Sequence, residues 1–514
     1  MSCKVTSIGL KGLEGYRVQV QVQVVEGMES IVVVGLPDAS VKESRERVSA
    51  ALRSLGFPLV DMKVVINLSP AEQKKNGPLF DLAIAIGVLK SGNFLKDEIP
   101  GDAGFIGALA LDGTVLPVEG MIAAIIAAKK LNLRTLFLPF DPSIPSIEMS
   151  GLELVYIETI QDVMDVLSGQ QLLPFARHPE RVEEHQVVEK DFDQIIGHEF
   201  AKRALEIAAS GEHFVLMDGP PGCGKSLLAE TFRSILPPLS KEAQLEKISL
   251  YQLAGAPYTS ITLPPYRHPH HSASAVSIVG GGSNPKPGEV SLAHRGVLFL
   301  DELGEFSKKS LDMLRQPLEN ETVTISRAHS TVTYPAKFIF IAAMNPCPCG
   351  YYGSKKQYCT CSDKQIKAYK GRVSGPILDR MDLLLSLKAV NMKNHDFAGI
   401  ESSEDIMKRV CAARERQYLR YEREICNGSV PFEELIKKSP LTPGQQSGLQ
   451  RLSITQGLSN RVQIKIIRLA RTISDLQGEE SITDDAMSEA LSLRRLPPFS
   501  SASLTGERKG LVYE

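Results

Sequence analysis

The side chains best suited to chemistry lie in one short stretch, residues 219–226, with the sequence GPPGCGKS. This stretch matches the pattern G-x-x-x-x-G-K-[ST], in which backbone N–H groups of a glycine-rich loop surround the phosphates of a nucleotide. Glycine has no Cβ, so the loop can turn its N–H groups inward, and the helix that follows directs its positive end at the phosphates. We therefore predict a phosphate loop formed by Gly219, Pro220, Pro221, Gly222, Cys223, Gly224, Lys225 and Ser226.

Two side chains of this loop have separate predicted roles. The Lys225 ammonium adds a point charge beside the phosphates, and the Ser226 hydroxyl binds Mg²⁺, so ATP and Mg²⁺ are the predicted cofactors. Residues 213–217 (HFVLM) predict a short buried strand, and residues 227–236 have helical periodicity. Strand, loop and helix is the order that the motif requires. The alternative is a glycine-rich turn without a ligand.

An acidic pair follows a second apolar run. Residues 297–300 (VLFL) predict a core strand, and Asp301 and Glu302 come directly after it. We predict that Asp301 holds Mg²⁺ through water and that Glu302 polarises the attacking water, which favours hydrolysis over binding alone. The alternative is a pair of helix N-cap residues after a core strand.

A third polar residue follows another predicted strand. An amphipathic helix is predicted over residues 307–320, a β-hairpin over 321–334 and a strand over 338–344, which ends at Asn345. The Asn345 amide can orient water against the γ-phosphate. Taken alone, Asn345 is also an ordinary turn residue before a proline.

Composition limits the class of protein. A chain of 514 residues should form two to four domains, and 43% hydrophobic with 23% charged residues is typical of a soluble protein. The net charge of −2 means that nucleic acid would need a local basic surface. No long apolar run or targeting segment is evident, so we expect a cytoplasmic protein without a membrane partner. Eight cysteines do not suggest a disulfide scaffold in so long a chain.

The predicted fold class is α/β throughout the first two domains. Residues 1–170 alternate strand and helix patterns, with the helix after residue 38 starting at the N-cap Asp38, and predict a mixed α/β domain. Residues 171–189 predict a linker and 190–390 the nucleotide-binding core. Residues 391–500 are helical and charged and predict a lid domain, followed by a tail at 501–514.

Two motifs in the first domain resemble the proteolytic domain of Lon-type proteases. These are KKNGPLFDLAIAIGVL at residues 74–89 and GTVLPVEG at 113–120. In Lon the corresponding segments carry a catalytic serine and a catalytic lysine, and the matching positions here are Leu79 and Ile122. Neither apolar side chain can act as a nucleophile or a base. The resemblance therefore implies a Lon-like fold without protease activity.

Nearly the whole chain resembles the ComM (YifB) family of magnesium-chelatase-like AAA+ ATPases. Its marks are YRHPHHSAS at residues 266–274, GEVSLAHRGVLFLDEL at 288–303, ISRA at 325–328 and AAMNPCPCG at 342–350. The resemblance implies an AAA+ core with a hairpin before the strand that ends at Asn345, and a helical lid. It also implies that the chains assemble into a homo-hexameric ring. This ring would be a helicase that drives branch migration of DNA junctions when incoming DNA recombines in natural transformation.

The resemblance assigns a role to an arginine within ILDRMDLL, residues 377–384. In the family an arginine at this place projects into the ATP site of the neighbouring subunit, where a guanidinium neutralises charge that develops in phosphoryl transfer. Arg380 is the matching residue. The alternative is a surface ion pair of Arg380 with Asp379 or Asp382.

A second arginine is implied in the lid. Arg461 lies in LSNR, at the start of a helix predicted over residues 460–476, and matches the arginine that reaches the γ-phosphate from the lid. Arg468 and Arg471 follow one or more turns later and are competing candidates.

Four of the cysteines are clustered as two CxC pairs separated by nine residues. Four thiolates close in sequence suit a tetrahedral Zn²⁺ site, which would be structural because no coordination position stays open. The predicted ligands are Cys347, Cys349, Cys359 and Cys361. Free or redox-active thiols are the alternative.

Candidate DNA contacts lie in two segments. Arg327 and His329 fall at the tip of the predicted hairpin, and Arg267 and His268 fall in the histidine-rich segment at residues 266–274. Such contacts would be to phosphate and shape, as suits a motor that moves over branched, single-stranded or double-stranded DNA of any sequence. For the histidine-rich segment, a solvated loop is the alternative.

Three functions remain open from the sequence. The first is a branch-migration helicase, the second a chelatase-type ATPase for cofactor assembly, and the third an ATP-driven protease. The core motifs are shared by the first two, and the apolar residues at positions 79 and 122 count against the third.

Overall fold

The computed structural model describes residues 2–35, 39–73, 75, 77–141, 144, 151–170, 190–257, 260–282, 285–327, 330–354, 357–388 and 401–494. Four features predicted from the sequence lie outside these residues: the linker at 171–189, the tail at 501–514, the N-cap Asp38 and the hairpin residue His329. For Arg327 only the backbone is described.

The chain forms two compact units. The first comprises Met1–His185, Gln244–Ile261 and Ser326–Tyr334, and the second comprises Gln186–Ala243, Thr262–Ile325 and Pro335–Glu514. Two short segments from the middle of the chain therefore belong to the unit that the N-terminal part forms.

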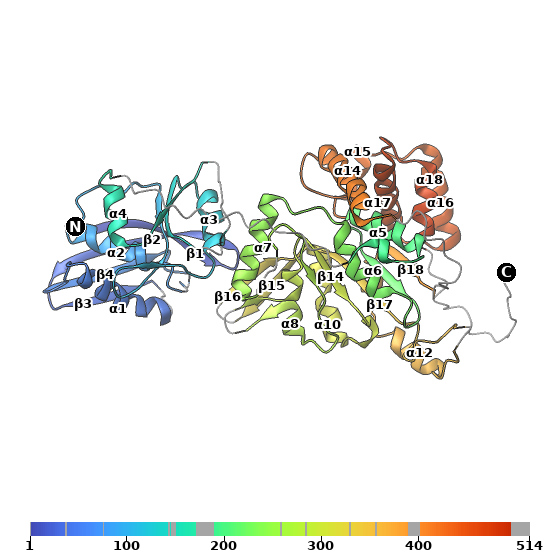
Figure 1. The fold of residues 1–514 in the computed structure, drawn as a ribbon, viewed down its shortest axis with the longest axis horizontal. Coiled ribbons are helices and arrows are strands. Elements are labelled where there is room, and N and C mark those ends of the chain that lie inside the picture. Colours follow the sequence, from blue (N-terminus) through green and yellow to red (C-terminus); the bar gives the residue numbers. More distant parts are fainter. Residues whose placement is uncertain are drawn as a thin grey trace. The chain divides into compact units, whose positions relative to one another are not determined.

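A seven-stranded mixed sheet is the centre of the first unit, in the order β3-β4-β2-β1-β5-β8-β9 (Figure 1). Strands β1, β2 and β4 are antiparallel neighbours, whereas β3 pairs parallel with β4, and β5, β8 and β9 continue in parallel from β1. A separate pair, β6 and β7, is antiparallel. The strands are β1 (Ser2–Lys11), β2 (Glu14–Glu26), β3 (Ser30–Val34), β4 (Met62–Ser69), β5 (Ala103–Phe105), β6 (Ala108–Leu109), β7 (Val115–Leu116), β8 (Thr135–Pro139) and β9 (Glu153–Ile157).

The alternating pattern predicted for residues 16–24 is confirmed by β2. Val18, Val20 and Val22 are buried, because side chains two residues apart point to the same face of a strand and here that face is the core. The strand predicted over 104–109 is instead two short strands, β5 and β6. Gly107, with φ +148°, lies between them, and a Cβ there would lie 2.5 Å from Val115 Cγ1.

Helices cover this sheet. They are α1 (Ala39–Ser54), α2 (Asp81–Ser91), α3 (Met121–Lys130) and α4 (Ile160–Leu167). Helix α2 is apolar on almost every side, and its one buried acid, Asp81, receives Arg47 at 2.6 Å. Leu79 and Ile122 both lie in one apolar cluster and expose only 5% and 0% of their surface, so neither position presents a side chain to solvent.

The two segments that return to the first unit complete its apolar interior. Helix α7 (Lys241–Ala254) contributes Ile248, which is fully buried in the same cluster as Ile8 and Ile122. Strand β16 (Ser330–Pro335) passes so close to the turn after β1 that a Cβ on Gly12 would lie 2.7 Å from Val332 Cγ1. The interior of the first unit thus depends on residues far along the chain.

The second unit is built on a parallel sheet of five strands in the order β11-β14-β17-β10-β18. Three of them, β14, β17 and β10, are adjacent, and their carboxyl ends meet at one edge of the sheet. The strands are β10 (Val215–Asp218), β11 (Tyr266–Arg267), β14 (Val297–Leu300), β17 (Ile339–Met344) and β18 (Leu383–Ser386).

Short elements connect these strands. They are the 3-10 turns η1 (Phe192–Gln194), η2 (Phe232–Ile235) and η3 (Leu303–Glu305), the helices α5 (Glu199–Gly211), α6 (Lys225–Thr231), α8 (Ala275–Val279), α9 (Glu289–Leu292), α10 (Lys308–Met313), α11 (Arg315–Asn320), α12 (Asp363–Lys370) and α13 (Gly375–Leu378), and the strands β12 (Gly280–Gly281), β13 (Lys286–Pro287) and β15 (Thr322–Arg327). The predicted hairpin is confirmed by β15 and β16. The helix predicted over 307–320 is two helices, because Pro317 has no N–H to donate to the carbonyl of Met313.

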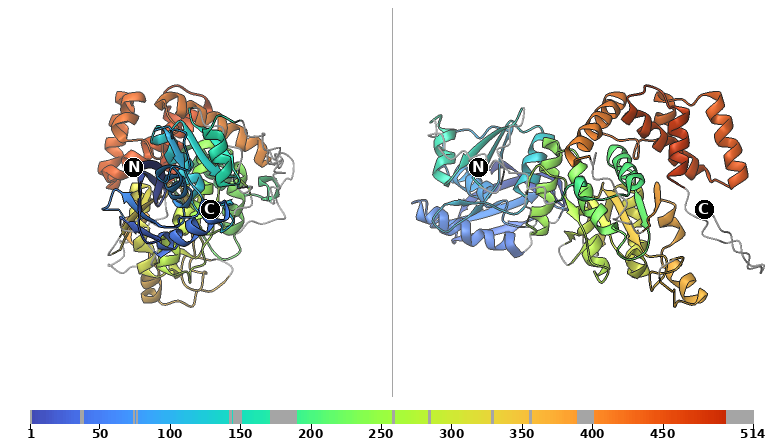
Figure 2. Two further views of the ribbon diagram at one scale, coloured as in Figure 1. Left: turned by 90° about the vertical axis from the view of Figure 1, so that its left-hand side faces the viewer. Right: turned by 45° about the vertical axis from the view of Figure 1, so that its right-hand side comes forward.

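Five further helices form the C-terminal region of the second unit, as the sequence predicts. They are α14 (Ser403–Tyr421), α15 (Phe432–Lys438), α16 (Pro443–Gln456), α17 (Asn460–Gln477) and α18 (Asp484–Ser492). The right-hand view of Figure 2 shows them, coloured orange to red, as one group. Their starts are defined by local chemistry: Thr442, for example, caps α16 with Gln445 in a capping box and is followed by a proline.

Within the residues that the structure describes, no helix combines the length and the apolar character needed to cross a lipid bilayer.

Candidate active site

The predicted phosphate loop lies between β10 and α6, the order of elements that its sequence predicts. Gly222 and Gly224 have φ values of +74° and +89°, in the left-handed region that a residue with a Cβ rarely adopts. Gly224 is also the N-cap of α6, so the first N–H groups of that helix face the loop. The glycines at these positions let the backbone form a cradle for an anion.

Lys225 connects the loop to the neighbouring strand. Its Nζ donates to the carbonyl oxygens of Gly219 at 2.6 Å and Pro220 at 3.0 Å, and to Oδ1 of Asn345 at 3.0 Å. The lysine is only 7% exposed. Its ammonium therefore lies at the centre of the predicted nucleotide site, in contact with the residue at the end of β17.

Ser226 and Asp301 lie side by side. The Ser226 hydroxyl donates to Oδ2 of Asp301 at 2.7 Å, and Oδ1 of Asp301 accepts from the backbone N–H of Glu302 at 2.8 Å. A hydroxyl and a carboxylate are hard oxygen ligands of the kind that Mg²⁺ prefers. The residues present thus fit a magnesium ion beside the phosphate loop.

Sheet topology explains why these side chains converge. Asp218 of β10 pairs with Met344 of β17, and Leu300 of β14 pairs with Ala342 of β17, so the three strands end together. Ligands of open parallel sheets bind at the carboxyl ends of the strands. The sequence predicts each polar residue separately, and the sheet brings them to one edge.

Glu302 has a partner that the sequence analysis missed. Oε2 of Glu302 lies 3.1 Å from Nδ1 of His271, while the carboxylate stays half exposed. His271 stands in the loop after β11 and packs against His270, with 4.1 Å between ring centroids. The cluster of histidines in HPHH was the only signal in the sequence, and it carried no information on which acid one of them would contact.

Arg380 is held within its own chain by an acid that the sequence did not suggest. Its guanidinium donates to Oε2 of Glu319 at 2.8 Å and to the carbonyl of Pro376 at 2.7 Å. The alternative pairing with Asp382 is not formed, because Lys465 of α17 binds that carboxylate at 2.7 Å and also donates to the carbonyl of Arg380. Although burial opposes it, the Lys465 ammonium lowers the pKa of the Asp382 carboxyl far below its usual range.

The three candidate arginines of the predicted lid all lie on α17, and they differ in their surroundings. Arg468 donates to the carbonyl oxygens of Gly428 and Val430, and Arg471 is fully buried against Asp475 at 2.9 Å. Arg461 is exposed at the first turn of α17, and among the described residues it has no hydrogen bond or ion pair. Only Arg461 has a guanidinium available to an incoming ligand.

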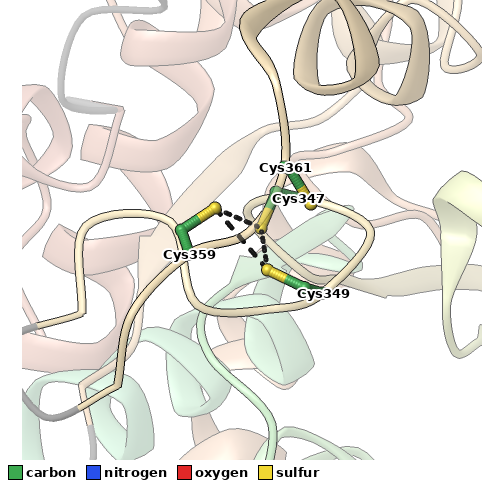
Figure 3. A group of neighbouring side chains, drawn as sticks. All are labelled: Cys347, Cys349, Cys359 and Cys361. Carbon is green, nitrogen blue, oxygen red and sulfur yellow. Dashed lines mark hydrogen bonds between the residues drawn. The ribbon is translucent and has the colours of Figure 1, made fainter.

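The four clustered cysteines come together in space (Figure 3). Their sulfur atoms all lie within 4.8 Å of one another, and three of the Sγ–Sγ distances are 3.3, 3.5 and 3.7 Å. A tetrahedral Zn²⁺ with Zn–S bonds of ~2.3 Å would separate its sulfurs by about 3.8 Å. The donor set and its spacing therefore fit a tetrahedral metal ion.

Two of the candidate DNA contacts are engaged inside the second unit. Arg267 forms a bidentate ion pair with Glu289, at 2.6 and 2.7 Å, and the ring of His268 lies 4.7 Å from that of Phe299. His268 is nevertheless exposed. These contacts position the segment that carries His271.

A buried charge cluster lies at the opposite, amino-terminal ends of the strands. Burial alone would raise the pKa of the Glu212 carboxyl, but Lys337, with Nζ at 2.8 Å, and Arg414, at 3.3 Å, outweigh it and lower the pKa to about 2. Both cations also line a cavity of about 480 Å³ at this end of the sheet. The cluster stabilises the fold away from the phosphate loop.

Family models of a magnesium chelatase subunit match most of the chain. The one described as "Magnesium chelatase, subunit ChlI" matches residues 191–395, "Subunit ChlI of Mg-chelatase" matches 20–142, and "Magnesium chelatase, subunit ChlI C-terminal" matches 400–494. The first of these matches contains the phosphate loop, the acidic pair and the cysteine cluster.

Full-length relatives give a narrower family. The chain is 38% identical to competence protein ComM of Haemophilus influenzae, over 94% of this chain and 96% of the relative. It is 36% identical to the protein YifB of Escherichia coli, over 94% and 95%. The 67 kDa magnesium-chelatase subunit of Chlorobaculum tepidum is more distant, with 24% identity over 60% of this chain and 43% of the subunit. The chain therefore belongs to the ComM and YifB family of magnesium-chelatase-like AAA+ ATPases.

Proposed function

We propose that this chain is the subunit of a ring-forming ATPase that drives branch migration of DNA junctions. In this proposal the ring, a homo-hexamer in the cytoplasm, promotes integration of incoming DNA by homologous recombination during natural transformation. The observation that carries the ATPase part is the convergence of Lys225, Ser226, Asp301 and Asn345 at one sheet edge. The name of the ComM relative, a competence protein, supports the DNA part.

The geometry suggests how hydrolysis would proceed. The phosphate loop and Lys225 bind the β- and γ-phosphates, and Lys225 exchanges its contact with Asn345 for phosphate oxygens. Mg²⁺ beside Ser226 and Asp301 would neutralise charge that develops on the phosphates. Glu302, oriented by His271, accepts the proton of the attacking water, and Asn345 positions that water.

A ring follows from the role proposed for Arg380. Its guanidinium is bound to Glu319 in its own chain, and Glu319 is more than half exposed. If Arg380 left Glu319 and bound the phosphates of the ATP in a neighbouring subunit, its guanidinium would lie where charge develops in the transition state. Arg461 would approach the same nucleotide from the lid.

We also propose that the first unit is a Lon-like domain without proteolytic activity. The positions that correspond to the Lon serine and lysine, Leu79 and Ile122, are buried together in an apolar cluster. Neither a nucleophile nor an amine base is present at these positions. Absence of casein cleavage by the purified protein with ATP is the expected result.

Chelatase-type cofactor assembly is the second candidate, because the family models of the magnesium chelatase subunit match this chain. Four-way junction DNA distinguishes the two. Branch migration predicts that purified protein converts a labelled junction into forked products with ATP, and that Lys225→Ala and Glu302→Gln abolish conversion. ATPase activity that is indifferent to junction DNA, with no conversion, would favour the chelatase-type function instead.

A further inference from the structure

The cysteine cluster is joined directly to the candidate active site by the chain. Cys347 comes two residues after Asn345 and is fully buried. After the last cysteine, Cys361, Ser362 begins helix α12 with a capping box. The cysteine segment, residues 347–361, therefore connects the end of β17 to α12 without an intervening linker.

The cysteine segment packs against the phosphate loop. Gly350 approaches Pro221 so closely that a Cβ at Gly350 would lie 2.5 Å from both Cγ and Cδ of the proline ring. Real Cβ atoms do not approach other atoms this closely, so the contact requires a glycine. Gly350 also has φ +82°, which gives a second reason for glycine there. The backbone just after the first CxC pair therefore packs directly against the predicted phosphate loop.

Helix α12 contacts the turn that follows the acidic pair. The Tyr369 ring lies against Gly304, where a Cβ would be 2.5 Å from Cζ. Just after the helix, Arg372 donates to the carbonyl of Gly304 and to the carboxylate of Glu305, both at 2.9 Å. Residues 304 and 305 directly follow the turn that contains Glu302.

We propose that the four cysteines bind one structural Zn²⁺, and that this zinc site positions the active site for hydrolysis. By cross-linking the two CxC pairs, the metal would hold Gly350 against Pro221 at one side and α12 against Gly304 at the other. Without the metal the four sulfurs would be free to separate, because in this proposal the metal joins the two CxC pairs. The inference rests on the ATPase function proposed above.

The chemistry of the ligands selects the metal. An all-thiolate tetrahedral set favours Zn²⁺, or iron in a sulfur-ligated centre, over Mg²⁺ and Ca²⁺, which take oxygen ligands. The predicted effect is on turnover and not on nucleotide binding. Lys225 and the glycines of the phosphate loop keep their own contacts, whereas the turn after Asp301 loses the element that aligns it.

The first experiment measures metal. Elemental analysis of the purified full-length protein should give about one zinc per chain, and both Cys359→Ser and Cys361→Ser should reduce it to background. Cys411→Ser is the matched control, because Cys411 lies on α14, outside the cluster, and should leave the zinc content unchanged. Replacement of zinc by Co²⁺ should give the visible absorption of a tetrahedral cobalt thiolate. A wild-type protein without zinc, or with iron in its place, overturns the assignment.

The second experiment separates binding from turnover. With a fluorescent ATP analogue, Cys359→Ser should bind nucleotide within a few-fold of wild type, while its kcat falls by about 10²-fold, as expected for misplaced catalytic groups. Unchanged kcat in a zinc-free variant refutes the positioning role. An equal loss of nucleotide binding and kcat also refutes it, because the damage would not be specific to hydrolysis.

A third variant keeps the test decisive if the cysteine variants do not fold. Arg372→Ala removes the hydrogen bonds to Gly304 and Glu305, so it should retain zinc and nucleotide binding and lower kcat by about tenfold, the effect of roughly 1.5 kcal/mol of lost hydrogen bonding. Full kcat in Arg372→Ala contradicts the proposed alignment. Wild type that binds zinc but hydrolyses no ATP would refute the ATPase function and leave the metal site standing, so the two failures are distinguishable.

Discussion

Nδ1 of His271 lies 3.1 Å from Oε2 of Glu302, and the two side chains come from loops that follow adjacent parallel strands, β11 and β14. Glu302 itself has φ +50°, a conformation that a residue with a Cβ adopts at some cost. The histidine thus fixes the direction of a carboxylate that stands on an unusual turn of the backbone.

We predict that His271→Ala lowers kcat by up to about fivefold, since a partly exposed ion pair contributes roughly 0.2–1 kcal/mol. Glu302→Gln should lower kcat further, on the order of 10²–10⁴-fold, with nucleotide binding retained. Steady-state ATPase assays measure both. His270→Ala removes the neighbouring imidazole, which binds Ser272, and serves as the control. If His271 acts through Glu302, the double variant is no slower than Glu302→Gln alone.

The role of Arg380 can be tested by mixing subunits. Arg380→Ala should lower kcat on the order of 10³-fold, because an arginine in this role stabilises charge in the transition state. Lys225→Ala should be inactive for a different reason, because it disables the phosphate loop of the subunit that carries the substitution. Mixed rings of the two variants should recover part of the turnover, since some interfaces combine an intact phosphate loop with an intact arginine.

Glu319→Ala is the companion to that experiment. It removes the acid that holds Arg380 within its own chain but leaves the arginine itself. Its rings should hydrolyse ATP at least as fast as wild type. Turnover that stays absent at every mixing ratio of Arg380→Ala and Lys225→Ala would contradict a role across the subunit interface.

The lid arginines should separate into functional and structural residues. Arg461→Ala should weaken ATP binding or turnover by about tenfold while Tm stays at the wild-type value, because the exposed side chain supports no other residue. Arg471→Ala should instead lower the free energy of unfolding by about 1–3 kcal/mol, since the fully buried guanidinium binds the carbonyl oxygens of Glu479 and Glu480, which would lose their donor. Thermal unfolding alongside ATPase assays distinguishes them, and the opposite pattern would reassign the lid arginine.

Stability of the second unit should fall in acid because of Glu212. Its folded-state pKa is about 2, whereas a glutamate in the unfolded chain titrates near ~4.3, so the folded state binds the proton less readily. The resulting stabilisation is complete above about pH 5 and is lost as the pH falls from there towards 2. It amounts to at most about 3 kcal/mol, from roughly 1.36 kcal/mol per pKa unit.

Urea unfolding at several pH values measures this effect. Wild type should lose more stability between neutral pH and pH 3 than Glu212→Gln, which has no carboxylate to protonate at this position. Glu433→Gln, at an exposed position on α15, should follow the wild-type curve. Parallel curves for wild type and Glu212→Gln would show that the buried pairs with Lys337 and Arg414 do not contribute.

The parts of the site that the sequence could predict are local ones. The phosphate loop, the acids after β14 and the asparagine after β17 each follow an apolar strand, and parallel strands that are neighbours bring such residues together without further information. Family membership could also be predicted, and the comparisons confirm it, because its motifs are contiguous stretches of sequence.

What the sequence could not predict depends on contacts between distant residues. His271 meets Glu302 only because β11 lies beside β14, and Arg380 meets Glu319 because Lys465 already occupies Asp382. Likewise, no local pattern in residues 244–261 indicates that they complete the first unit, since an apolar helix face does not specify which core it joins.

Those returning residues affect how the protein is made. When a ribosome has synthesised residues 1–185, every strand of the large mixed sheet has been made. Ile248, which lies in the apolar cluster of this unit, and Val332, which packs against Gly12, are still to be synthesised. Until those residues are synthesised, part of the apolar surface of the nascent unit stays exposed to solvent. Exposed apolar surface promotes aggregation and binding by chaperones. A chain truncated near residue 185 would have an incompletely packed core. A chain that extends beyond residue 334 would contain all the segments that pack this core.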